Sequence, residues 1–291
     1  MKARGFAYHR PDTVDEAVGL LREFGDEAKI LAGGQSLVPM LAMRLTHFEN
    51  LIDISRIDEL IGIELRDDDV WVGAATPDAF VGMDDEVAES VPLLTLATPY
   101  VGHFQIRNRG TLGGSIAHAD PAGEYPAVAL ALDARMEVAS RRGSRAIGAT
   151  DFFTGLWETS LAGDEVLVGV RFPVWRGRCG FAVEEFARRH GDFAIAGTAL
   201  AVQLDAENKV TRCGIGLMGL GPTPVRASAA EQAVVGRRIE DLTAQDVGGI
   251  AMTGLDDIPA DLQGSARYRI RVGAAMVARA WTNATREALD A

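Results

Sequence analysis

Residues 111–124, TLGGSIAHADPAGE, decide the fold, because two adjacent glycines stand between two hydroxyl residues at a point where a strand pattern breaks. Adjacent glycines allow positive φ and close approach of the backbone to a ligand, so consecutive N–H groups can converge on one anion. We therefore predict a phosphate-binding loop. Its predicted contact residues are Thr111, Leu112, Gly113, Gly114 and Ser115.

A second run of the same kind lies earlier in the chain, after the apolar pair Ile30 and Leu31. It consists of Ala32, Gly33, Gly34, Gln35 and Ser36. Either glycine pair alone is as common in a plain tight turn, but two such loops together suit a diphosphate. Neither run has the glycine spacing or the lysine of a P-loop, or the GxGxxG of a Rossmann fold. The predicted ligand is therefore a dinucleotide held by another kind of fold.

The composition is that of an ordinary globular protein, with 291 residues, 47% hydrophobic and 24% charged. This length is enough for two or three small subdomains. The formal net charge of -12 argues against nucleic acid as a partner, because neutralising phosphates needs a basic surface. The densest basic run, RRGSR at residues 141–145, is interpreted as a hairpin turn in solvent and not as a binding site.

The chain contains two cysteines, Cys179 and Cys213, and no CxxC motif. It therefore supplies neither an iron–sulfur cluster nor a structural zinc site, and we expect no metal site. This cysteine usage fits a reducing, cytoplasmic compartment. No stretch of the sequence approaches the length of a membrane span, and the start MKARGFAYHRP has no signal-like apolar region, so no membrane span is expected.

Residues 1–57 are predicted to form a β-α-β unit. Thr13 and Glu16 have the spacing of a capping box, which starts a helix that ends at Gly25. Strands are predicted at residues 29–31 and 51–54. Between them, Ser36 is expected to cap a helix with Leu37, Met40, Leu41 and Leu45 on one face, and Met40 and Met43 are expected to pack in the core.

Residues 58–176 are predicted to form a second unit and residues 177–291 a third. For the second unit we expect a mixed sheet with strands at 70–75, 135–139, 146–147 and 165–172, a helix at 89–101, and a helix or strand at 126–132. For the third we expect a three-stranded antiparallel sheet, at 180–187, 194–204 and 210–217, and helices at 222–235 and 268–289.

Four segments, in order along the chain, carry a resemblance to a known family. They are AGGQSLVPMLAMRL at 32–45, QIRNRGTLGGSIAHADPAGEYPA at 105–127, DEVLVGVRFP at 164–173 and ARRHGDFAIAG at 187–197. Together they resemble the FAD-binding medium subunit of molybdenum hydroxylases, as in carbon monoxide dehydrogenase, quinoline and nicotine oxidoreductases, and the flavin domain of xanthine dehydrogenase. The resemblance implies an α+β fold of the vanillyl-alcohol-oxidase type. In that fold two subdomains enclose FAD and a C-terminal domain covers it.

The resemblance also implies roles for individual residues. The two glycine runs match the pyrophosphate loops, Glu124 matches an acidic contact to the flavin nucleotide, Leu167 a leucine beside the cofactor, and Phe193 the side chain over the isoalloxazine ring. Asp120, beside the second run, is a further candidate contact to the nucleotide. Relatives often have tyrosine at the place of Phe193 and a lysine before it, where this chain has Glu184 and Glu185, so tuning of the flavin is expected to differ.

Several polar residues beside the second run leave alternatives open. Arg107 and Arg109 can neutralise a diphosphate, or can pair with local carboxylates and orient the loop. For His118 we expect a structural hydrogen bond within the loop. No histidine or cysteine compels covalent attachment of the flavin, so FAD is expected to be dissociable.

The implied function is electron transfer. Electrons leave a substrate at a molybdenum centre on a large molybdopterin-binding subunit, cross [2Fe-2S] clusters on a small subunit, and reach FAD on this chain, in a complex expected to be a dimer of heterotrimers. The chain itself needs no catalytic side chain, because the cofactor does the redox chemistry. Two alternatives remain, a self-contained FAD oxidoreductase with its own small organic substrate, and an assembly module that has lost its flavin.

Overall fold

The computed structural model describes residues 2–291. The first sheet contains three parallel strands, β1 (Ala7–His9), β2 (Ala28–Leu31) and β3 (Asn50–Asp53), in the order β1-β3-β2. Helix α1 (Val14–Phe24) begins where the Thr13 hydroxyl accepts from Glu16 N, and it ends at Gly25, whose φ is 54°. Helix α2 (Leu37–Met43) joins β2 to β3, so the predicted β-α-β unit is confirmed, with β1 as an additional strand.

The core position expected for Met43 in α2 is wrong. Of the residues of this helix only Leu41 is buried, whereas Met43 is 48% exposed. The helix ends at Met43 because Arg44 adopts the left-handed conformation with φ 61°, which leaves Leu45 outside the helix and 68% exposed.

The second sheet contains β4 (Ile63–Arg66), β5 (Asp69–Gly73), β10 (Val166–Pro173), β6 (Arg135–Ser140) and β7 (Gly143–Gly148), in that spatial order. All four pairings between these neighbours are antiparallel, so the predicted mixed sheet is wrong. Two of the pairs are joined by tight turns, which only antiparallel strands permit, and residue alternation shows the faces of a strand but not its direction.

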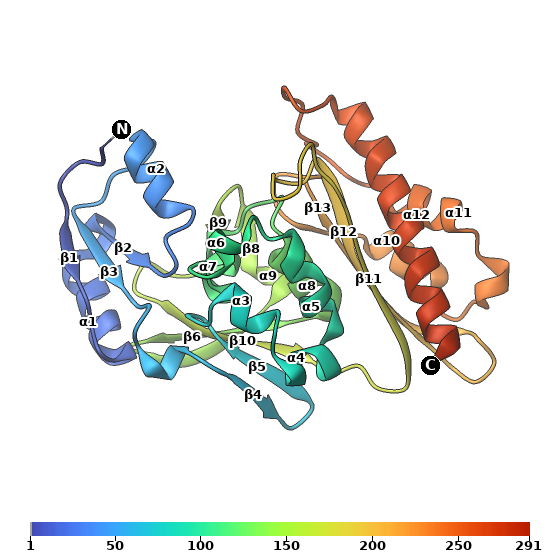
Figure 1. Ribbon diagram of the computed structural model, residues 1–291, viewed down its shortest axis with the longest axis horizontal. Coiled ribbons are helices and arrows are strands. Elements are labelled where there is room, and N and C mark those ends of the chain that lie inside the picture. The colour runs from blue at the N-terminus through green and yellow to red at the C-terminus, as the bar shows by residue number, and fades with distance from the viewer. Residues whose placement is uncertain (1) are drawn as a thin grey trace.

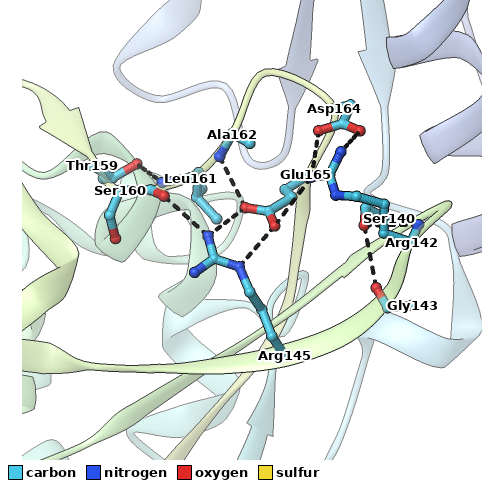
Figure 2. Close-up of polar contacts among 10 residues, drawn as sticks. All are labelled: Ser140, Arg142, Gly143, Arg145, Thr159, Ser160, Leu161, Ala162, Asp164 and Glu165. Carbon is cyan, nitrogen blue, oxygen red and sulfur yellow. Dashed lines mark hydrogen bonds and ion pairs between the residues drawn. The ribbon is translucent and has the colours of Figure 1, made fainter.

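The basic run lies at the turn between β6 and β7, as predicted. Figure 2 shows that Arg142 and Arg145 point to carboxylates after β9 (Glu158–Thr159). Arg142 donates to both oxygens of Asp164, at 2.5 and 2.9 Å, and Arg145 donates to both oxygens of Glu165, at 2.8 Å each. These two arginines are thus occupied by local ion pairs.

The helices of the second unit include α8 (Glu124–Leu132), whose residues from Tyr125 onward are all buried. The segment predicted as one helix at 89–101 is broken by Pro92, which lacks the N–H that a continuous helix needs. It forms α4 (Asp85–Ser90), α5 (Pro92–Ala97) and the short η3 (Thr98–Tyr100). The other short elements are η1 (Gly25–Glu27), η2 (Asp58–Leu60), α3 (Asp78–Val81), α6 (Phe104–Arg107), α7 (Leu112–His118), α9 (Ala149–Phe152) and β8 (Phe153–Gly155).

The third sheet is the predicted antiparallel meander with one short strand added. It contains β11 (Arg178–Phe186), β12 (Ala196–Leu204), β13 (Val210–Met218) and β14 (Val225–Arg226). The helix expected at 222–235 is shorter, because β14 takes its first residues. The remaining helices are α10 (Ser228–Val234), η4 (Ile239–Asp241), α11 (Ala244–Ala251) and α12 (Ala266–Asp290). In Figure 1, α12 covers one face of this sheet, while α5 and α8 lie against the other.

Helix α8 joins the second and third units, because one hydrophobic cluster contains α8, the second sheet and the inner face of the third. A separate cluster lies between the third sheet and α12. We propose domains at residues 1–57, 58–176 and 177–291, a division that the three separate sheets support.

Candidate functional site

The two glycine runs lie against each other. We refer to residues 32–36 as the first loop and to residues 111–115 as the second loop. A Cβ on Gly33 would overlap the carbonyl oxygen of Arg109 and lie 2.6 Å from Cα of Gly110. A Cβ on Gly114 would lie 3.4 Å from Cβ of Ala32. Two segments separated by more than seventy residues, between Ser36 and Thr111, therefore form one surface.

The first loop offers free amide donors. Gly34 has φ 72°, a conformation that favours glycine. Within residues 2–291, the amides of Gly33, Gly34, Gln35 and Ser36 donate no hydrogen bond to the protein, whereas the carbonyls of Gly34 and Ser36 accept from the first turn of α2. The Ser36 hydroxyl makes no capping bond either. Unpaired amides at a helix start attract anions.

The second loop is arranged differently from the prediction. Gly113 and Gly114 lie in the first turn of α7 and have no positive φ. Their amides are already bound, to Ala74 O at 3.1 Å and to Thr111 Oγ1 at 3.0 Å. The expected convergence of bare amides is therefore wrong at this loop. Gly113 is required by close packing, since a Cβ there would overlap Ala74.

The contribution of the second loop is its surface and its hydroxyls. The side chain of Leu112 is fully buried in the core, so it has no exposed surface to offer a ligand. Ser115 is partly exposed. Thr111 accepts the Gly114 amide and keeps its own O–H to donate. Of the two loops, the first has free backbone amides, whereas the second has hydroxyl groups, of which that of Thr111 belongs to a residue that is 4% exposed.

The turn after α7 is held by Asp120 and Trp157. Asp120 accepts from Ala122 N at 2.9 Å and from Trp157 Nε1 at 3.1 Å. The Trp157 ring stacks on His118, with 6.1 Å between centroids and an interplanar angle of 11°. Burial lowers the pKa of His118, which keeps it neutral at pH 7. The hydrogen bond expected of His118 is wrong, because within residues 2–291 its side chain makes none and contacts the turn through stacking on Trp157.

Acidic side chains with raised pKa values surround the same region. Burial, then the charge of Glu124, raises the pKa of Asp78 to about 8, against a lowering effect of Arg107. Burial, with a smaller contribution from the charge of Asp120, raises the pKa of Glu124 to about 7, against a lowering effect of the backbone amide of Glu124. Burial, then Glu124, raises the pKa of Glu185 to about 8. These three carboxyl groups are partly protonated at neutral pH.

Arg107 is fixed by backbone carbonyls. Its Nη1 donates to Val101 O at 3.1 Å and to Gly102 O at 3.0 Å. It therefore orients the segment before α6, with carbonyls in place of the local carboxylates that the sequence suggested. Arg109 is exposed, and its carbonyl is the group that Gly33 contacts.

The remaining predicted contacts lie on two other elements. Leu167, on β10, is 5% exposed and belongs to the core that α8 shares. Phe193, between β11 and β12, is 60% exposed. Of the two glutamates that replace the family's lysine, Glu184 pairs with Arg279 at 3.1 Å, and Glu185 Oε2 is buried without a hydrogen-bond partner within the described chain. Residues 2–291 contain no group of three or more His, Cys, Asp or Glu side chains suited to a metal ion.

Two family models match the chain. Residues 4–175 match the FAD binding domain in molybdopterin dehydrogenase, and residues 181–284 match the CO dehydrogenase flavoprotein C-terminal domain. The chain belongs to this family. It is a flavoprotein subunit of the molybdopterin dehydrogenases, and the resemblance seen in its motifs is confirmed.

Individual relatives of this flavoprotein subunit align over nearly the whole chain. The 6-hydroxypseudooxynicotine dehydrogenase complex subunit alpha of Paenarthrobacter nicotinovorans is 38% identical, covering 100% of both chains. The carbon monoxide dehydrogenase medium chain of Hydrogenophaga pseudoflava is 36% identical, covering 94% of this chain and 95% of the relative. Among solved structures, carbon monoxide dehydrogenase from Hydrogenophaga pseudoflava has a TM-score of 0.95 at 37% identity, covering 99% of both chains. Quinoline 2-oxidoreductase from Pseudomonas putida 86 has a TM-score of 0.92 at 34% identity, covering 99% of this chain and 100% of the other.

The cofactor of this family is FAD, and the residues of this flavoprotein subunit fit it. Gly33 has no side chain, and this allows the backbone of the first loop to contact Gly110; a Cβ at this position would prevent the contact. Its amides are the donors that a diphosphate needs, and the hydroxyls of Thr111 and Ser115 lie on the adjoining α7.

Sequence reasoning missed three residues of this site. Gly110, Asp78 and Trp157 were not predicted as parts of it. Gly110 and Asp78 meet just before the second loop, and Trp157 contacts Asp120 and His118. Gly110 and Trp157 have no signal in the sequence, and an acid after Thr76-Pro77 indicates only a helix start. That signal does not show which glycine the carboxyl group meets.

Proposed function

We propose that this chain is the electron-transfer subunit of a molybdenum hydroxylase, passing electrons from iron–sulfur clusters on a partner subunit through FAD to an external acceptor. When bound, FAD supplies the redox chemistry. The observation that carries the proposal is the contact between the two glycine loops in a chain that matches the family from residue 4 to residue 284.

Each predicted site residue has a proposed part. The first loop holds the diphosphate through the amides of Gly33, Gly34, Gln35 and Ser36, with Ala32 packed on the second loop. Thr111 and Ser115 donate hydroxyl hydrogen bonds. Leu112, Gly113 and Gly114 set the position of α7. Asp120 and Glu124 meet the polar part of the flavin nucleotide, Leu167 lies beside it, and Phe193 covers the ring. The exposure of Phe193 supports that role, because a ring without covering neighbours is free to pack on a ligand.

The proposed partners are a large molybdopterin-binding subunit and a small [2Fe-2S] subunit, in a dimer of heterotrimers. The names of the relatives, a medium chain and a complex subunit alpha, support assembly into a multi-subunit enzyme. We also propose a cytoplasmic location, which the two free, buried cysteines support. No helix in residues 2–291 combines the length and apolar composition of a membrane span.

An absorbance spectrum of the natively purified material, with a gel of what accompanies it, tests this proposal. We expect flavin bands near about 450 nm together with iron–sulfur absorbance, and three chains on the gel. Flavin bands from this chain alone would favour the self-contained oxidoreductase. A colourless chain that takes up no FAD would favour the assembly module.

Substitutions in the two loops test the assignment of the site. Gly33→Val should abolish FAD binding, because its side chain would overlap the backbone of Arg109 and Gly110 and separate the loops. Gly114→Val should weaken it strongly, because its Cβ would lie 2.8 Å from Thr111 Oγ1. Glu124→Ala should weaken it less than either change. Gly163→Ala, at a glycine with no atom near its Cβ position, is the matched control. Full flavin occupancy in both valine variants would show that the loops are misassigned.

A further inference from the structure

Asp78 is a carboxylic acid buried behind the two loops. It is the first residue of α3 and is 2% exposed. Its backbone N–H donates to Gly110 O at 2.9 Å. Its Oδ2 occupies the space that a Cβ of Gly110 would need, while Cα of the same glycine is the atom that Gly33 approaches. One glycine therefore separates the carboxyl group from the first loop.

The carboxyl group has no compensating partner. In the part of the chain that the structure describes, Oδ1 is buried and receives no hydrogen bond, and Asp78 takes part in no ion pair. Burying an ionised carboxylate without a donor or a cation is strongly unfavourable, whereas the neutral acid is buried at a much lower cost in free energy. The geometry thus favours the protonated form.

We propose that FAD binding is coupled to proton uptake by Asp78, which carries its proton in the FAD-bound chain. The proposal rests on the assignment of the two loops to the FAD diphosphate. A diphosphate on the first loop adds negative charge close to a buried carboxyl group, and like charges disfavour ionisation. The reaction is a simple addition: the Asp78 carboxylate and one proton from solvent give the carboxylic acid, with no other bond changed.

The charged and titratable groups that face Asp78 come from two elements. Helix α8 presents Glu124, which raises the pKa of Asp78, and Tyr125, whose hydroxyl is 2.9 Å from Thr98 Oγ1. Helix α6 presents Arg107, which lowers it. Because burial is the largest cause and Arg107 is held by backbone carbonyls, the free chain already has the pKa of Asp78 at about 8. A diphosphate raises it further.

The direction in which FAD affinity changes with pH follows from a pKa of Asp78 that is lower in the free chain than in the FAD-bound chain. Below about pH 7, Asp78 is protonated in both the free and the bound chain, so Asp78 adds no pH dependence to FAD affinity there. As the pH rises through about 8, the free chain loses the proton and binding has to restore it. The dissociation constant should then increase by up to about tenfold for each pH unit, until the bound form also ionises.

The test is FAD titration of the flavin-stripped full chain from about pH 6 to about pH 9.5, followed by quenching of flavin fluorescence. Calorimetry in buffers of different ionisation enthalpy counts the protons taken up. We expect the wild-type chain to take up close to one more proton than Asp78→Asn at about pH 8.5. The affinity of the variant should match the wild type at about pH 6 and show no loss near pH 8. Asp78→Ser serves if the asparagine variant does not fold.

Two further variants sharpen the result. Asp256→Asn removes an exposed carboxylate and should keep the wild-type profile. Glu124→Gln removes a repulsive neighbour, so the fall in affinity should begin at lower pH. A wild-type slope retained in both Asp78 variants would overturn the proposal. Failure of the wild-type chain to bind FAD at any pH, or normal binding by Gly33→Val, would instead overturn the loop assignment on which it rests.

Discussion

At the scale of a single residue, ionisation of the buried carboxyl group of Glu185 lowers the free energy of unfolding. Burial raises its pKa to about 8, and its Oε2 has no hydrogen-bond partner within residues 2–291. A carboxyl group with a raised native pKa contributes its full stability below its unfolded pKa of about 4.3, and this contribution is lost as the pH rises toward the native value. The chain should therefore lose stability between about pH 4 and pH 8 in part through Glu185.

Glu185→Gln should remove this dependence. The variant and the wild type should melt at similar temperatures near pH 5, whereas the variant should melt several degrees higher near pH 8, since about 1 kcal/mol corresponds to roughly 2–4 °C in a chain of this size. Thermal melts across this pH range give the comparison. The exposed Glu207→Gln is the control. Equal melting temperatures of wild type and Glu185→Gln at both pH values would show that Glu185 is ionised without cost.

At the scale of elements, α12 is fastened at its start by a buried arginine. Arg269 is 4% exposed and donates to both oxygens of Asp261, at 3.0 and 2.8 Å. It also donates to Ile195 O at 2.6 Å and to Gly219 O at 3.2 Å. These carbonyls belong to the residue just before β12 and the residue just after β13, so one guanidinium connects the helix to the edge of the sheet near Phe193.

Arg269→Met should keep the apolar volume and lose these bonds. We expect the free energy of unfolding to fall by about 1–3 kcal/mol, because two carbonyls are left without a donor. Chemical denaturation measures the change. Arg267→Met, on the exposed side of the same turn, should lie within about 0.5 kcal/mol of the wild type. Equal effects of the two substitutions would mean that the contacts of Arg269 contribute nothing beyond those of a surface residue.

At the scale of the whole molecule, FAD should stabilise the fold, because the site joins loops from the first and second units. A ligand that binds only the folded chain adds about 2.7 kcal/mol at one hundred times its dissociation constant. That free energy corresponds to a rise in melting temperature of roughly 5–10 °C. Differential scanning fluorimetry with added FAD measures it.

The matched control ligand is FMN, which has the same ring but a single phosphate and no adenosine. FMN should give a smaller rise than FAD at equal concentration, because the first loop offers the donors of a diphosphate site. Gly33→Val should show no rise with either ligand. A rise in melting temperature with FMN as large as that with FAD would indicate that the loops do not bind the diphosphate.

Much of the architecture could be predicted from residue patterns alone. Thr13 and Gly25 bound α1 because capping is a local interaction, and the antiparallel run of β11, β12 and β13 follows from alternating apolar residues joined by turns. The family membership also follows from local sequence, since its motifs are short and ordered along the chain. Strand direction in the second sheet was not predictable, because alternation is the same in both directions.

The sequence by itself determined the family and predicts that two glycine loops, one acid at residue 124 and an aromatic residue at 193 belong to its FAD site. Only the tertiary structure decided which hydrogen-bonding groups each loop has free. Within the described chain the amides of the first loop are free, whereas the second loop has hydroxyl groups. The reason is that Gly113 and Gly114 lie in a helix, where their amides donate hydrogen bonds to Ala74 and Thr111. It also places Asp78 behind Gly110. Such contacts join residues far apart in the chain, and no local pattern encodes which carbonyl or carboxyl group will meet a given glycine.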